Sequence, residues 1–184
     1  MSGQNDPKQL MKLAKMGDKE AFGVLYDCYF VPVFRYVYLR VKNRAEAEDL
    51  VQEVFLKIYN SLPSYEERGR PPLAYFFTIA RNLIVDSWRK KKADTVDLEN
   101  LEIRDLRPLP LEMLQQQESA EAVRQLLKEL PPDQQEVLVL KFVNEQSNQE
   151  IAALLEKSEE AVRQIQSRAL KALRKNVTDV LSSP

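Results

Sequence analysis

The amino-acid sequence predicts an all-α protein with two small helical domains joined by a flexible acidic linker. Only four glycines occur among 184 residues, and most segments carry apolar residues at helical spacing. Between residues 94 and 116 the apolar spacing is weak, and acidic residues gather there with Pro108 and Pro110, which is typical of a linker. A short helix, a three-residue turn and a basic helix follow near the end, the spacing of a helix-turn-helix. We place the domains at residues 5–93 and 117–178.

Four helices are expected in the first domain. An Asp-Pro pair at residues 6–7 marks a helix start, and Asp18 can cap a second helix, which we expect Pro32 to kink or interrupt. Asn43 begins a capping-box pattern at the third helix, and Pro71 opens the fourth. The expected core stripes of the second to fourth helices include Phe22, Leu25, Tyr29, Leu50, Val54, Ile58, Phe76 and Ile84.

The second domain is also predicted to be helical. Apolar residues at helical spacing run up to Leu130, where two prolines end the pattern, and a second stripe follows from Val137. Ser147 starts a second capping box, S-N-Q-E. Ser158 can cap the last helix, whose apolar stripe contains Val162, Ile165, Ala169 and Leu173.

Charge is distributed in blocks, although the formal net charge is only −1. Seven basic residues and one acid lie between Arg68 and Lys92, and six basic residues and two acids lie between Lys157 and Lys175. Between the two blocks, the stretch from Asp94 to Glu118 holds seven acids and two arginines. Two basic blocks divided by an acidic stretch predict two contact sites on a polyanion.

The composition argues against several classes of protein. There is no histidine, and Cys28 is the only cysteine, so the commonest general base and zinc ligand are missing. We expect no cofactor, no metal site and no enzymatic activity. Cys28 is expected to be a small buried residue. Because no apolar run resembles a signal peptide or a membrane span, we expect a soluble, cytoplasmic protein.

Two neighbouring helices of opposite charge indicate an adaptor between a protein and DNA. The helix AEAEDLVQEVFLKIY is acidic in its first half, and the helix PLAYFFTIARNLIVDSWRKKK ends in four basic residues. An acidic face suits a basic protein partner, and a basic helix with aromatic residues suits nucleic acid. The alternatives are solvated faces, a basic helix end that interacts with the helix dipole, and core packing of Phe77 and Trp88.

The last helix carries candidate DNA-reading side chains. In a helix-turn-helix the second helix enters the major groove, where arginine can read guanine and glutamine can read adenine. The side chains that fall away from the apolar stripe are Arg163, Gln164, Ser167, Arg168 and Lys171. The alternative is an exposed amphipathic helix of an all-α bundle.

Four stretches, in this order and spacing, resemble the extracytoplasmic-function (ECF) group of bacterial sigma factors. They are EAEDLVQEVFLKIY, IARNLIVDSWRKKK, LPPDQQEVLVLKF and SNQEIAALLEKSEEAVRQIQSRALKALRK. The resemblance implies that the first domain binds the β′ coiled coil of core RNA polymerase and reads and melts the −10 promoter element. The second domain would read the −35 element and bind the β flap, and an anti-sigma factor would hold the protein inactive.

The resemblance also implies roles for single residues. The positions that match polymerase binding are Asp49, Gln52 and Glu53. The positions that match −10 recognition are Arg81, Asn82, Asp86 and Arg89, and the loop at residues 65–70 is expected to hold a base flipped from the melted strand. Capture of an unpaired strand needs aromatic rings and positive side chains, which adds Tyr65, Arg68, Arg70, Tyr75, Phe77 and Lys90 to the −10 site. Those assigned to −35 DNA are Ser158, Arg163, Gln164, Ser167, Arg168 and Lys171.

Two other functions compete with this interpretation. A stand-alone helix-turn-helix regulator would need a two-fold interface to set its half-site spacing, and no long heptad seam is present. An enzyme acting on nucleic acid would need groups that this composition lacks, since there is neither histidine nor a glycine-rich phosphate loop.

Overall fold

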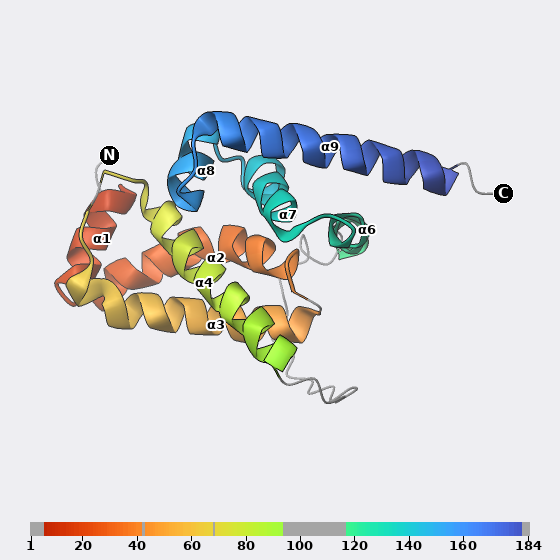
Figure 1. Cartoon of the computed structure of the whole chain (residues 1–184). Helices are drawn as coiled ribbons and strands as arrows, with labels where there is room; N and C mark the ends of the chain where they lie inside the picture. Colours follow the sequence, from red (N-terminus) through yellow and green to blue (C-terminus); the bar gives the residue numbers. More distant parts are fainter. Residues whose placement is uncertain (1–5, 42, 68, 94–116, 182–184) are drawn as a thin grey trace. The chain divides into compact units, whose positions relative to one another are not determined.

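The computed structural model describes residues 6–41, 43–67, 69–93 and 117–181, and for residues 91–93, 117–120 and 176–181 it describes the backbone alone. Its internal contacts divide the chain into two compact units, residues 1–90 and 91–184. All described elements are helical (Figure 1), which confirms the predicted all-α class. The expected linker, residues 94–116, lies outside the described residues, as does Arg68.

The first unit contains four α-helices and one short 3-10 helix. Their bounds are α1 Pro7–Lys15, α2 Lys19–Tyr38, α3 Arg44–Ser61, η1 Leu62–Ser64 and α4 Pro72–Ala93. Three predicted N-caps are confirmed, because the side chains of Asp6, Asp18 and Asn43 each accept a hydrogen bond from a backbone N–H of the first turn. The fourth helix starts at Pro72, one residue after the predicted Pro71.

Pro32 was expected to kink or interrupt the second helix, and an interruption is excluded, since α2 runs as one helix from Lys19 to Tyr38. Proline removes one backbone donor from a helix. Buried neighbours on either side, among them Tyr29 and Val33, hold both halves of α2 against the core, and this packing outweighs the lost bond.

An aromatic cluster joins α2, α3 and α4. The ring of Phe76 on α4 lies 4.8 Å from that of Tyr29 on α2 and 5.6 Å from that of Phe55 on α3. Just after α2 the guanidinium of the buried Arg40 lies over the ring of Tyr36, 5.2 Å from its centroid, and over the ring of Trp88, 5.1 Å from its centroid. Cation–π contact and a 2.6 Å hydrogen bond to the Tyr36 hydroxyl compensate the burial of this charge.

The second unit is built around its last helix. Its elements are α6 Gln117–Lys128, α7 Pro132–Leu138, the π-helical turn η2 Val139–Val143, α8 Asn148–Leu155 and α9 Glu159–Leu181. Helices α7 and α8 pack against α9, and their core is aliphatic. Val137, Ile151 and Val162 are fully buried.

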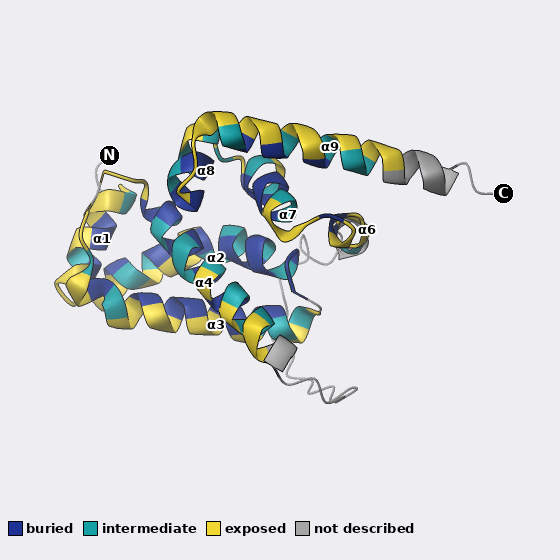
Figure 2. Ribbon diagram, in the orientation of Figure 1, coloured by how far each residue is buried: buried dark blue, intermediate teal, exposed yellow. Residues whose placement is uncertain are grey.

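Burial alternates along each helix, so that one side faces its unit's core and the other faces solvent (Figure 2). Cys28 lies on the exposed side of α2, so the expectation that it is buried is wrong. An α-helix turns by about 100° per residue, so Cys28 points well away from the direction of the buried Tyr29 that follows it. Over the described part of the chain, no helix has the length and apolar character needed to cross a bilayer.

Candidate functional site

The outer face of α3 carries the predicted acidic site. Asp49, Gln52 and Glu53 are all exposed, and their spacing places them on one side of the helix. The Glu53 carboxylate lies 3.5 Å from the ammonium of Lys57, one turn further on, and both side chains are about half exposed. A pair so open to water is weak, so these acids are available to a cationic partner.

The same face exposes two large apolar side chains that the sequence interpretation missed. Leu56 is 60% exposed and Tyr59 is 42% exposed. The Tyr59 ring packs edge-on against Phe22 of α2, with 5.0 Å between centroids, so it is held in place while one side stays open. Both residues fall outside the buried stripe of α3, and this signal was present in the sequence. Acidic and apolar groups side by side form a surface suited to binding another protein.

A second surface runs along α4. Tyr75, Asn82, Asp86 and Arg89 share one side of this helix by their spacing. Arg89 and Lys90 are exposed, and the Arg89 guanidinium lies 3.8 Å from the Asp86 carboxylate. Both members of that pair are largely solvated, so Arg89 can change partner at small cost. Arg81 lies to one side of this face and is half-buried.

Phe77 corrects one residue of the predicted DNA site. It is completely buried, and its ring packs 5.1 Å from that of Tyr36. Two residues along a helix turn the side chain by about 200°, so Phe77 points into the core while Tyr75 stays at the surface. A side chain buried in this way cannot contact DNA directly.

The loop before α4 is held by Tyr65 and Tyr75. Their rings are 4.8 Å apart, and the Tyr75 hydroxyl lies 2.6 Å from the Ser61 hydroxyl. Burial, followed by the nearby Glu67 carboxylate and Tyr75, raises the pKa of the Tyr65 phenol above its usual value. Arg70 is exposed at the end of the loop, next to Gly69, whose φ of 70° is a left-handed conformation that suits glycine.

The second unit holds a helix-turn-helix formed by α8 and α9. The predicted capping box is confirmed, because Ser147 and Glu150 each bond the other's backbone N–H. The chain turns at Glu156, which adopts a left-handed conformation with a φ of 54° at a position where glycine is usual. Ser158 then caps α9 through a 3.1 Å bond from the Ala161 N–H, so this residue of the predicted DNA set has a structural role.

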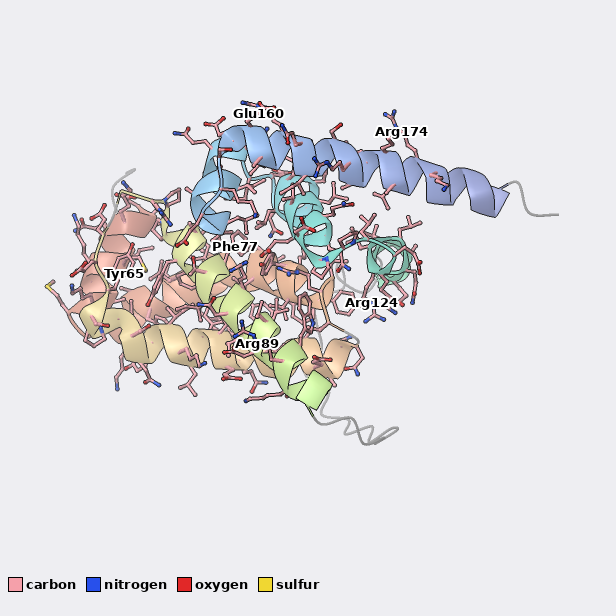
Figure 3. All side chains as sticks on the ribbon, viewed as in Figure 1. Tyr65, Phe77, Arg89, Arg124, Glu160 and Arg174 are labelled. Atoms are coloured by element: carbon pink, nitrogen blue, oxygen red, sulfur yellow. The ribbon has the colours of Figure 1, made fainter. Side chains whose placement is uncertain are left out.

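The exposed side of α9 carries the other five predicted residues. Arg163, Gln164, Ser167, Arg168 and Lys171 are all exposed, whereas Val162, Ile165 and Ala169 are buried. The Glu160 carboxylate, near the start of α9 (Figure 3), accepts hydrogen bonds from Arg163 at 3.3 Å and from Gln164 at 3.4 Å. These contacts keep both side chains on one polar face before any ligand arrives.

In the described ranges, no group of three or more His, Cys, Asp or Glu side chains could hold a metal ion. The arrangement instead offers an acidic and apolar face, a basic helix with surface tyrosines, and a helix-turn-helix. Two family models match the chain. Residues 25–93 match the family model for sigma-70 region 2, and residues 126–175 match that for sigma-70 region 4.

The chain belongs to the ECF sigma factors. It is 33% identical over 165 residues to the ECF RNA polymerase sigma factor SigX of Bacillus subtilis, covering 86% of this chain and 84% of SigX. It is also 33% identical over 173 residues to BldN of Streptomyces coelicolor, covering 93% of this chain and 66% of BldN. The structure of CnrH in complex with the cytosolic domain of CnrY has the same fold, with a TM-score of 0.74 over 95% of this chain and 99% of that one, at 24% identity.

Sigma factors are transcription initiation factors rather than catalysts. This sigma factor acts with core RNA polymerase in promoter recognition, as the two matched regions indicate.

Proposed function

We propose that this sigma factor divides three contacts between its two units. The first unit, which we set at residues 5–93, binds core polymerase and captures the melted −10 element. The second, residues 117–178, reads the −35 element as duplex, and residues 94–116 connect them. The observation that carries this proposal is the presence, on one small unit, of an acidic face on α3 and a basic face on α4.

For the polymerase contact we infer that Asp49, Gln52 and Glu53 bind the β′ coiled coil. Leu56 and Tyr59 join them, because they lie on the same exposed face and provide apolar area beside the charges. The second unit would bind the β flap. Phe142, which is 56% exposed in the π-helical turn η2, is the apolar side chain best suited to that contact.

For DNA, we assign capture of the melted strand to Tyr65 and Tyr75, with backbone contacts from the exposed cations of the loop and α4. Unpaired bases stack on aromatic rings, while positive side chains follow the phosphates. The residues proposed for −10 DNA are Tyr65, Arg68, Arg70, Tyr75, Arg81, Asn82, Asp86, Arg89 and Lys90. Phe77 is left out because it is buried.

Duplex recognition is assigned to α9. Arg163, Gln164, Ser167 and Arg168 would meet base edges in the major groove. Lys171 is further along the helix and suits a phosphate, which fixes position without reading sequence. Ser158 contributes indirectly by capping the helix.

We further propose that the protein works in the cytoplasm, where polymerase and chromosome are, and that it has no catalytic activity of its own. An anti-sigma factor would cover the apolar groups exposed on the free protein. The exposure of Leu56 and Phe142 supports such a masking partner, and the similar protein CnrH is seen in a complex with the cytosolic domain of CnrY.

Gel filtration of the purified chain with bacterial core RNA polymerase tests the proposal. We expect gel filtration to show a complex of one chain per core enzyme. In a footprinting assay, this complex should protect a promoter selected from random DNA, whereas the chain alone should bind that promoter weakly. Tight binding to an operator without polymerase, together with no binding to core, would instead identify a stand-alone regulator.

A further inference from the structure

The first helix carries a row of lysines that the assignments above leave unused. Lys8, Lys12 and Lys15 are exposed and lie four and three residues apart on α1, so they share one side of the helix. The opposite side, with Leu10, is buried. The segment matched by the region 2 family model begins only at residue 25, so it does not include this helix.

These lysines lie beside a hollow of about 170 Å³ that also borders Tyr65 and Glu67, two residues of the loop proposed to hold the flipped base. The hollow is lined by Lys8, Met11, Lys12, Lys15, Tyr65 and Glu67. The Lys15 ammonium donates a 2.6 Å hydrogen bond to the backbone carbonyl of Tyr65. A charged donor makes this bond stronger than a neutral one, and it fixes the start of the loop against α1.

An anion already sits between the other two lysines. The Glu67 carboxylate lies 3.5 Å from the ammonium of Lys8 and 3.6 Å from that of Lys12. The three side chains are between 36% and 64% exposed, and ion pairs this open to water contribute little to stability. A phosphate of a bound strand carries the same sign of charge and can displace the carboxylate.

We propose that Lys8 and Lys12 bind the sugar–phosphate backbone of the melted promoter strand, next to the base held by the loop, and that Glu67 occupies these lysines until the strand arrives. The hollow brings the lysines and Tyr65 to one place. A strand whose base stacks on Tyr65 therefore brings its adjoining phosphates to α1. This inference rests on the proposed function and adds α1 to the DNA-binding surface.

The test measures binding of the reconstituted holoenzyme to a fork DNA whose −10 region is single-stranded and which lacks a −35 element. Each phosphate contact to a single strand contributes about 0.7 to the slope of log K against log salt concentration. Replacing both lysines, in the variant Lys8→Ala with Lys12→Ala, is expected to reduce that slope by about 1.4. The charge-preserving variant Lys8→Arg with Lys12→Arg is expected to keep it, as is a control, Lys19→Ala with Lys128→Ala, at exposed lysines that do not line the hollow.

Glu67→Gln separates this role from a purely structural one. If Glu67 only holds the loop in place, its removal weakens binding in the same direction as removal of the lysines. If Glu67 competes with DNA, its removal is expected to strengthen binding about two- to fivefold, in line with the small energy of exposed ion pairs.

The inference is overturned if the double alanine variant keeps the unsubstituted slope, or if Glu67→Gln binds the fork more weakly. Failure of the proposed function looks different, because then the unsubstituted chain does not deliver core polymerase to the fork at all.

Discussion

The two units of this sigma factor use different side chains for their cores and their surfaces. All seven tyrosines, six of the seven phenylalanines and the only tryptophan lie within residues 1–90. The second unit has an aliphatic core, and its one aromatic residue, Phe142, is exposed. A surface that captures unstacked bases needs aromatic rings, whereas a helix that reads duplex edges needs long polar side chains.

The difference also shows that aromatic content alone does not identify a binding surface. Phe76 and Phe77 are fully buried and hold α4 against α2, while Tyr65 and Tyr75 are half-buried at the surface. The core thus positions the reading surface, and only the rings at its edge are open to DNA.

The largest effect is expected at the acidic face of α3, because neither unit reaches promoter DNA unless this face binds core polymerase. Reversing two charges, with Asp49→Lys and Glu53→Lys, should lower the affinity for core polymerase at least about 100-fold, because like charges at an interface cost several kcal/mol. Both DNA contacts should then be lost together. Fluorescence anisotropy of labelled protein gives the affinity.

A matched control, Asp27→Lys with Glu129→Lys, makes the same change in net charge at exposed positions, one in each unit. We expect its affinity to stay within about twofold, since surface charges away from the contact mainly affect long-range attraction. Equal losses in the two variants would show that α3 is not the docking face.

A smaller effect should separate melting from duplex recognition. Tyr65→Ala removes a ring on which a base can stack, and such stacking is worth about 1–3 kcal/mol per base. We expect about 30-fold less promoter opening, measured as permanganate reactivity of unpaired thymines, with binding to core unchanged. Tyr65→Phe keeps the ring and should open promoters normally. An alanine variant that opens them equally well would remove Tyr65 from the capture site.

A substitution in the second unit should impair duplex recognition rather than melting. Arg168→Ala should lower transcription from the protein's own promoter about 10-fold, since one good base contact is worth roughly 1–3 kcal/mol. The loss should disappear on a template whose −35 element has been replaced by unrelated sequence. A loss of the same size on both templates would mean that Arg168 contacts phosphates or supports the fold.

The smallest expected effect concerns stability at alkaline pH. Burial raises the pKa of Tyr29 to about 12, whereas an unfolded tyrosine titrates near about 10. Its contribution to stability is therefore complete below pH 10 and is lost as the pH rises through 12. The first unit, followed by Trp88 fluorescence, should melt at lower temperature as the pH rises above about 10.

Tyr29→Phe should flatten this alkaline decline, because phenylalanine has no proton to lose. The comparison variant is Tyr59→Phe at an exposed position, and it should leave the decline unchanged. If both variants behave alike, the burial of Tyr29 is not the cause.

Helical pattern and caps predicted the fold well because both depend on short-range spacing. The Ser147 capping box and the buried stripe of α9 follow directly from residues three and four apart. The uninterrupted α2 could not be predicted, since it depends on packing from other helices on both sides of Pro32.

Site residues were harder to predict than helices. Whether Phe77 faces DNA or the core depends on where α2 lies, and only the contact with Tyr36 settles it. The Lys8–Glu67 and Lys12–Glu67 ion pairs join residues more than fifty positions apart, so no local pattern could reveal them. Leu56 could have been found, because an apolar residue on a charged helical face is visible in the sequence.

Run-off transcription with core polymerase and the purified chain tests the central claim most directly. If one unit captures the melted strand while the other reads the duplex, the chain should make core polymerase start at one position on its selected promoter. Transcripts should fall strongly when either Tyr65→Ala or Arg168→Ala is added. An unsubstituted chain that binds core but never confers start-site choice on any template would contradict the claim.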